Sequence, residues 1–162
     1  MKPAEALDLL RAFYRDKSAM RQRHAASAAL VADYDFNNTY QYVIAREDVQ
    51  LNWLRDAIAE AGGAAQDAAM PTLDVQGKKE DAQRRVVTDD RDAAQAFVDR
   101  WRPRVEAMTN ARNRVMLRVV LGETLEQKRF FDQMLAGRTD LLGRRAAGAG
   151  TKGDVLPTRW VE

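Results

Sequence analysis

The chain has no cysteine among its 162 residues and only one histidine. Without cysteine there are no disulfide bonds, thiolate metal ligands or thiol catalysis, which fits a reducing compartment. No apolar run approaches the roughly 20 residues that a membrane helix needs. The opening segment, MKPAEALDLLRAF, carries acids and lacks the apolar stretch of a secretory signal. We therefore expect a cytoplasmic protein with no membrane contact.

The chain also has little net charge. Its 26 basic residues face 24 acidic ones, which leaves a net charge of +2. Such a balance creates no strong field for a polyanion, and the short arginine pairs at 84–85 and 144–145 are read as solubilising. The glycine-containing segment at 148–153 lacks the strand and helix that flank a phosphate loop. We therefore expect no nucleic-acid partner.

Helical periodicity dominates the sequence. It is clearest over residues 37–62, where apolar side chains recur at steps of three and four. This seam consists of Tyr40, Ile44, Leu51, Leu54 and Ile58, with Glu47 between the second and third. A carboxylate that faces a core must be paired, protonated or bound to a metal. Glu47 is therefore the main lead to a function.

A first helix is predicted from Pro3, with a seam that includes Lys17 and His24. Lys17 is expected near the end of the bundle, with its ammonium group reaching solvent. A third helix is expected after a cap at Thr88 or Asp89.

The stripe of this third helix is Ala94, Val98, Trp101, Val105 and Met108. Pro103 interrupts it and predicts a kink or a break.

A fourth helix is predicted over about 111–135, with two competing seams. One seam contains Glu123 and Glu126, and the other contains Thr124 and Phe131. No strand pattern of any length appears, so the sequence predicts an all-α protein.

The segment 62–88 is too long for an ordinary connection in a helical hairpin. It is predicted to be a crossover along the bundle, which lets the helices before and after it run parallel. Residues 138–162 are predicted to form a partly irregular tail, in which Leu156 and Trp160 dock on the helices. The expected organisation is a four-helix bundle over 1–137 followed by this tail.

The predicted helices place His24, Glu47, Glu123 and Glu126 at about one height, with Gln50 one turn beyond Glu47. Two antiparallel hairpins, a long crossover and carboxylates in mid-helix resemble the ferritin-like superfamily, including rubrerythrin-type four-helix bundles. The segments IAREDVQLNWLRDAI and LGETLEQKRFF are similar to its two motif-bearing helices. The resemblance implies iron or manganese held by inward carboxylates and histidines.

The chain departs from that ligand pattern at several positions. Gln50 and Glu126 stand where the family has histidines, and His24 stands where a glutamate is usual. The third helix offers only Val98 and Trp101 at the matching height. A standard site for two metal ions therefore cannot be carried over.

Two functions follow from these observations. One is an atypical iron or manganese centre with redox or metal-handling activity, and its ligands are His24, Glu47, Gln50, Glu123 and Glu126. The alternative is a metal-free structural or protein-interaction bundle, in which His24 and Glu47 form a buried pair. A homo-oligomer, most simply a dimer, or a partner protein is expected. The sequence leaves open whether the chain is an enzyme.

Overall fold

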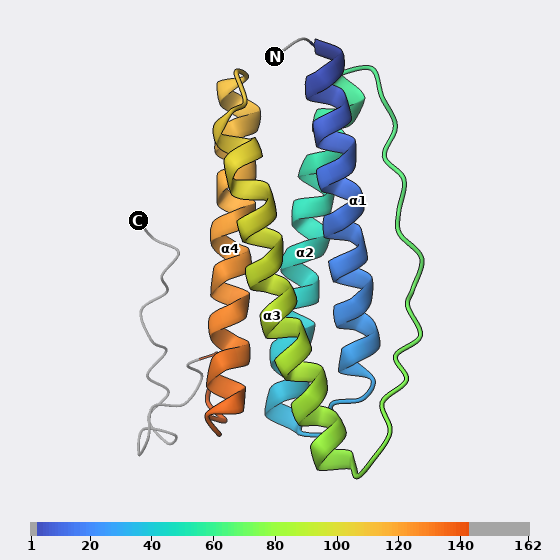
Figure 1. Cartoon of the computed structure of the whole chain (residues 1–162), viewed down its shortest axis with the longest axis vertical. Coiled ribbons are helices and arrows are strands. Elements are labelled where there is room, and N and C mark those ends of the chain that lie inside the picture. Colours follow the sequence, from blue (N-terminus) through green and yellow to red (C-terminus); the bar gives the residue numbers. More distant parts are fainter. Residues whose placement is uncertain (1–2, 143–162) are drawn as a thin grey trace, which may run out of the picture.

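The computed structural model describes residues 3–142, and all regular structure in that range is helical. The four helices are α1 (Pro3–Ala28), α2 (Tyr34–Glu60), α3 (Lys79–Glu106) and α4 (Ala111–Leu135). They lie side by side as two close pairs, α1 with α2 and α3 with α4 (Figure 1). The all-α prediction is confirmed, and the arrangement is that of a four-helix bundle. Within residues 3–142, no helix has both the length and the apolar character needed to cross a membrane.

Helix α2 begins at Tyr34, three residues before the predicted start. Its N-cap is Asp33, whose side chain accepts a hydrogen bond of 2.9 Å from the backbone N–H of Phe36. The helix ends just before Gly62, whose φ of 79° is in the left-handed region that favours glycine. Helix α4 has the predicted bounds, and the Asn110 side chain caps it.

Helix α3 begins at Lys79, ten residues before Asp89, so the predicted extent of the crossover to residue 88 was wrong. Residues 79–88, KEDAQRRVVT, are mostly good helix formers, and the acids of the first turn favour the helix dipole. Val86 and Val87 are buried, which anchors this extension to the core. The charged residues 79–81, which were counted as part of the crossover, form the exposed first turn of this helix.

Pro103 lies inside α3, which continues to Glu106. Of the two alternatives predicted at Pro103, a kink or a break, the break is therefore wrong. A proline in the last turn removes one backbone hydrogen bond from a helix that is about to end.

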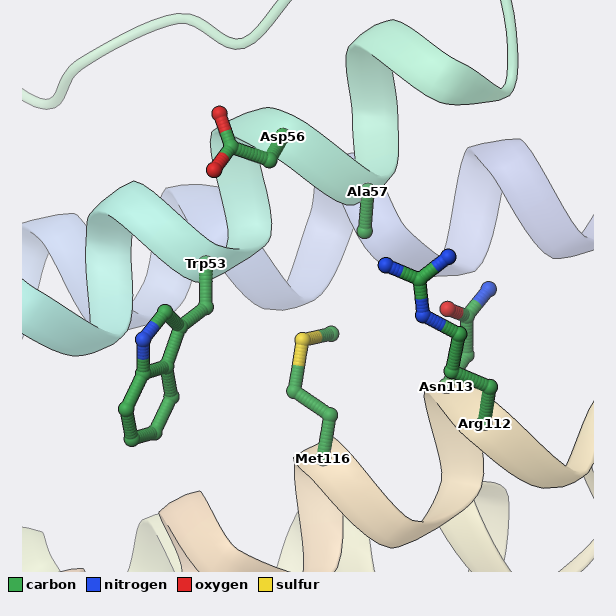
Figure 2. Close-up of a pocket in the computed structure, with 6 residues that line it drawn as sticks. All are labelled: Trp53, Asp56, Ala57, Arg112, Asn113 and Met116. Carbon is green, nitrogen blue, oxygen red and sulfur yellow. The ribbon is translucent and has the colours of Figure 1, made fainter.

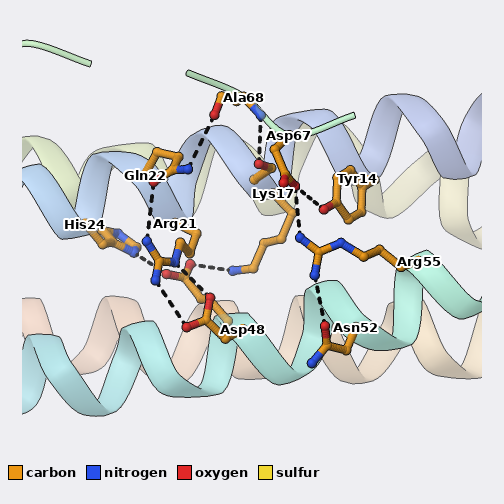
Figure 3. Close-up of polar contacts among 12 residues, drawn as sticks. Tyr14, Lys17, Arg21, Gln22, His24, Asp48, Asn52, Arg55, Asp67 and Ala68 are labelled. Atoms are coloured by element: carbon orange, nitrogen blue, oxygen red, sulfur yellow. Dashed lines mark hydrogen bonds and ion pairs between the residues drawn. The ribbon is translucent and has the colours of Figure 1, made fainter. Parts of the chain in front are cut away.

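The crossover, residues 61–78, runs in extended form from one end of the helices to the other (Figure 1). Consequently α2 and α3 run in the same direction. Contacts to α1 hold the crossover in place: the N–H of Ala68 donates to Ser18 Oγ at 2.9 Å, and Tyr14 donates to the Asp67 carboxylate. Arg55 of α2 also binds Asp67, at 3.0 Å (Figure 3).

The core consists of two apolar clusters with a polar layer between them. The first cluster is centred on Phe13, Leu54, Phe97, Trp101 and Leu117. The second is centred on Tyr40, Ile44, Val87, Phe131 and Met134. The side chains between the clusters, which we call the polar layer, are Lys17, His24, Glu47, Asp90, Thr124 and Gln127, and each is at most 3% exposed.

Of the predicted tail, residues 138–142 are described, and Leu141 packs into the second apolar cluster. Leu156 and Trp160 lie outside the described residues.

Candidate functional site

Glu47 lies at the centre of the polar layer, fully buried, with a partner for each carboxylate oxygen. Lys17 Nζ lies 2.8 Å from Oε1, and His24 Nδ1 lies 2.9 Å from Oε2. Figure 3 shows Lys17 and His24 extending from α1. The pairing of His24 with Glu47, expected in the metal-free alternative, is present.

Lys17 does not reach solvent, so that prediction was wrong. Its side chain is 0% exposed, and its ammonium group also donates to Thr124 Oγ1 of α4 at 3.4 Å. The prediction assumed that a lysine on an inner seam must lie near a helix end. Here the carboxylate of Glu47 supplies the countercharge that permits full burial.

The charges in this group change one another's protonation. Burial lowers the pKa of His24, but the adjacent Glu47 carboxylate outweighs burial, and the pKa is raised from its ordinary value. Burial raises the pKa of Glu47, but His24 and Lys17 together lower it below its ordinary value. The arrangement therefore favours a carboxylate held between two cations.

A second buried acid, Asp90 of α3, lies in the same layer. It accepts a hydrogen bond of 2.6 Å from the Tyr40 hydroxyl and pairs with Arg23 Nε at 2.8 Å. Burial and the neighbouring carboxylate raise the pKa of Tyr40.

Sequence reasoning missed Asp90 because the helix was predicted to start only at its neighbour. The available signal was its position four residues before Ala94, on the same stripe of α3. Because α3 starts earlier than predicted, Asp90 lies at the height along the bundle where Val98 and Trp101 were expected. Val98 and Trp101 lie in the first apolar cluster instead.

Glu123 lies in a separate contact between α2 and α4. Arg46 Nη2 binds its Oε1 at 2.6 Å, and Gln50 Nε2 donates to its Oε2. Glu126 is half-buried one turn further along α4. The inner face of α4 carries Thr124 and Gln127 instead of these two acids, so the competing seam through Thr124 is the buried one.

The five predicted ligands therefore divide into His24 with Glu47, Gln50 with Glu123, and Glu126. Among residues 3–142, no three His, Cys, Asp or Glu side chains lie together so that they could hold a metal ion. An ion at Glu47 would have to displace the Lys17 ammonium or the His24 ring from the carboxylate oxygens. The donor set does not fit the iron or manganese centre that the resemblance implies.

The polar layer is incompletely hydrogen-bonded within the described part of the chain. His24 Nε2 and both side-chain polar atoms of Gln127 are buried without a protein partner there. A buried ion pair such as Lys17 with Glu47 adds little net stability, because the loss of hydration offsets the attraction. The layer is therefore better explained by specifying one arrangement of helices than by stabilising it.

Comparison of the chain with models of protein families, with curated proteins and with solved structures gives no match. The class that fold and site define is an all-α, four-helix protein with an ion-paired polar layer across its core.

Proposed function

We propose that this protein is a metal-free assembly module of ferritin-like topology, which presents fixed helical faces to a second copy or to a partner protein. The crossover between two parallel helices supports the topology, because ferritin-like bundles have one such connection. The observation that carries the proposal is the Lys17 ammonium group, 2.8 Å from Glu47 Oε1 with both side chains fully buried. A cation of the chain itself neutralises the acid at the centre of the core.

The polar layer gives such a module a single arrangement. Sliding one helix by a turn would separate Lys17 from Glu47, or Tyr40 from Asp90, and would leave charged groups buried and unpaired. Apolar contacts alone tolerate such shifts better, because they are not directional. The layer therefore fixes the outer faces as well as the core.

Metal analysis of protein purified without chelators and then loaded with iron or manganese tests the proposal. We expect less than about a tenth of an equivalent of either metal. A metal ion would first have to displace the Lys17 ammonium group and the His24 N–H from the Glu47 carboxylate. Glu47→Gln is the matched variant, and Asp99→Asn on the exposed face of α3 is the control. One equivalent in the wild type and in the control, lost in Glu47→Gln with its helical content retained, would overturn the proposal in favour of a metal centre.

A further inference from the structure

The outer face formed by α2 and α4 carries apolar side chains in contact with solvent. We call it the α2–α4 face; its exposed apolar residues are Val49, Trp53, Val115 and Val119, which are 37%, 36%, 55% and 44% exposed. They recur at helical spacing, so those of each helix lie on one side of it. Trp53 and Met116 lie on either side of a shallow pocket of about 230 Å³ between the two helices (Figure 2).

Ion pairs between α2 and α4 flank this apolar area at both ends. At one end Arg46 of α2 binds Glu123 of α4 at 2.6 Å. At the other end Arg112 of α4 binds Glu60 of α2 at 2.9 Å. Each helix therefore has a base at the N-terminal end of its part of the face and an acid at the other end.

We infer that the α2–α4 face binds a second copy of this chain, about a two-fold axis that runs parallel to the two helices; the inference rests on the proposed assembly function and names its surface. Such an axis sets α2 of one copy over α4 of the other at the same height. Arg46 of one copy then faces Glu123 of the other, and Glu60 faces Arg112. The apolar residues of the two copies meet between these ends.

Charge complementarity is what selects a second copy as the occupant. Both flanking pairs already join the two helices at matching heights, so the two-fold axis repeats the same acid–base pairings between copies. No like charges of these four residues meet across the interface. The Trp53 side chain lies near the centre, where aromatic residues contribute most to association.

Sedimentation velocity of the full-length chain tests whether this face associates. We expect a monomer–dimer equilibrium within about 1 µM to 1 mM, because a face two helices wide is at the small end of protein interfaces. Val119→Glu is expected to raise the dissociation constant at least about tenfold by placing a charge in the apolar centre. The matched control is Tyr34→Glu, since Tyr34 is 78% exposed at the far end of α2.

A charge-reversal pair tests the axis. In Glu60→Lys, the introduced lysine faces Arg112 of an identical copy, and in Arg112→Glu two acids face each other. Each variant alone is therefore expected to be monomeric where the wild type dimerises. An equimolar mixture is expected to form heterodimers, because both contacts then join opposite charges. Both side chains are more than half exposed, so loss of the pair within one copy has little effect on the fold.

Several results would overturn the inference. These are a monomeric wild type over the whole range, equal effects of Val119→Glu and Tyr34→Glu, or a mixture that stays monomeric. A full-length monomer that dimerises only when shortened to residue 142 would show that the tail occupies the face instead. A metal-free protein that dimerises through another surface would refute this face but leave the assembly proposal standing, whereas a bound metal refutes the assembly proposal itself.

Discussion

At the residue scale, Lys17 and Glu47 are the least expected pair in the molecule. Both are fully buried in the middle of their helices, at 2.8 Å from each other. Removing two charges from water costs free energy, and the attraction between them offsets that cost only when further groups satisfy the remaining donors and acceptors. Here His24 and Thr124 do so. Each member of the group therefore depends on the others.

Replacing Lys17 with methionine tests this dependence. The Glu47 carboxylate would lose one of its two cationic partners while it stays buried, so we expect a loss of roughly 3–5 kcal/mol in the free energy of unfolding. Chemical denaturation monitored by circular dichroism measures it. The double variant Lys17→Met with Glu47→Gln removes the buried charge as well and is expected to recover more than half of the loss. Equal destabilisation of the single and double variants would contradict an ion-pair role for Lys17.

At the element scale, the crossover is a long segment without helix or strand that is nevertheless held along α1. Two adjacent residues hold it: Ala68 through its backbone, and Asp67 through bonds with Tyr14 and Arg55. Burial and the bond to Asp67 raise the pKa of Tyr14 to about 12. The crossover is the segment that connects the α1–α2 pair to the α3–α4 pair, so this attachment fixes the path of that connection along α1.

Asp67→Ala is expected to release this part of the crossover. The Tyr14 hydroxyl would lose its acceptor, and the free energy of unfolding should fall by about 1 kcal/mol, the value of a typical hydrogen bond. We also expect the pKa of Tyr14 to move down from about 12, which ultraviolet titration of the phenol measures. Asp74→Ala, at an exposed position of the same segment, is the control. An unchanged titration of Tyr14 in Asp67→Ala would refute the contact.

At the scale of the whole molecule, the polar layer links the stability of the bundle to pH. Glu47 has a lowered pKa in the folded state, so its contribution is present above its ordinary value of 4.5 and is lost as pH falls through the folded value. His24 has a raised pKa, so its contribution is complete below its ordinary value of 6.5 and is lost as pH rises through the folded value. Lys17 and Asp90 also face His24, with opposite effects on its charge.

The contribution of Glu47 and His24 to the free energy of unfolding should therefore be largest between about pH 4.5 and 6.5. It should decline at lower and at higher pH. The difference between wild type and Glu47→Gln, measured by denaturant titration from acid to alkaline pH, isolates the contribution. Asp99→Asn is the control, because it also removes a carboxylate but lies on the exposed face of α3. A difference for Glu47→Gln that is constant with pH would contradict the linkage.

Much of the architecture was predictable from local pattern. The four helices, the crossover, the stripe of α3 and the burial of Glu47 beside His24 follow from residue spacing and from the heights of residues on helices of known length. The errors came where local pattern is ambiguous. The charged segment after Lys78 is compatible with a loop or with an exposed part of a helix. Taking it as a loop placed the start of α3 about ten residues too late, so Asp90 was not recognised as part of the inner stripe of that helix. The fourth helix offered two seams, and only contact with the other helices could choose between them.

The sequence by itself determined the all-α class, because its apolar residues recur at the helical period, and it determined that a carboxylate would face the core. The pairing with His24 was among the sequence-based alternatives, but only the tertiary structure showed that Lys17 is the second partner of that carboxylate. Lys17, Thr124 and Asp90 lie far from Glu47 along the chain, and packing four helices brings them into one layer. Partner choice in a low-dielectric core depends on distances of a few ångströms between helices, and spacing within one helix does not encode those distances.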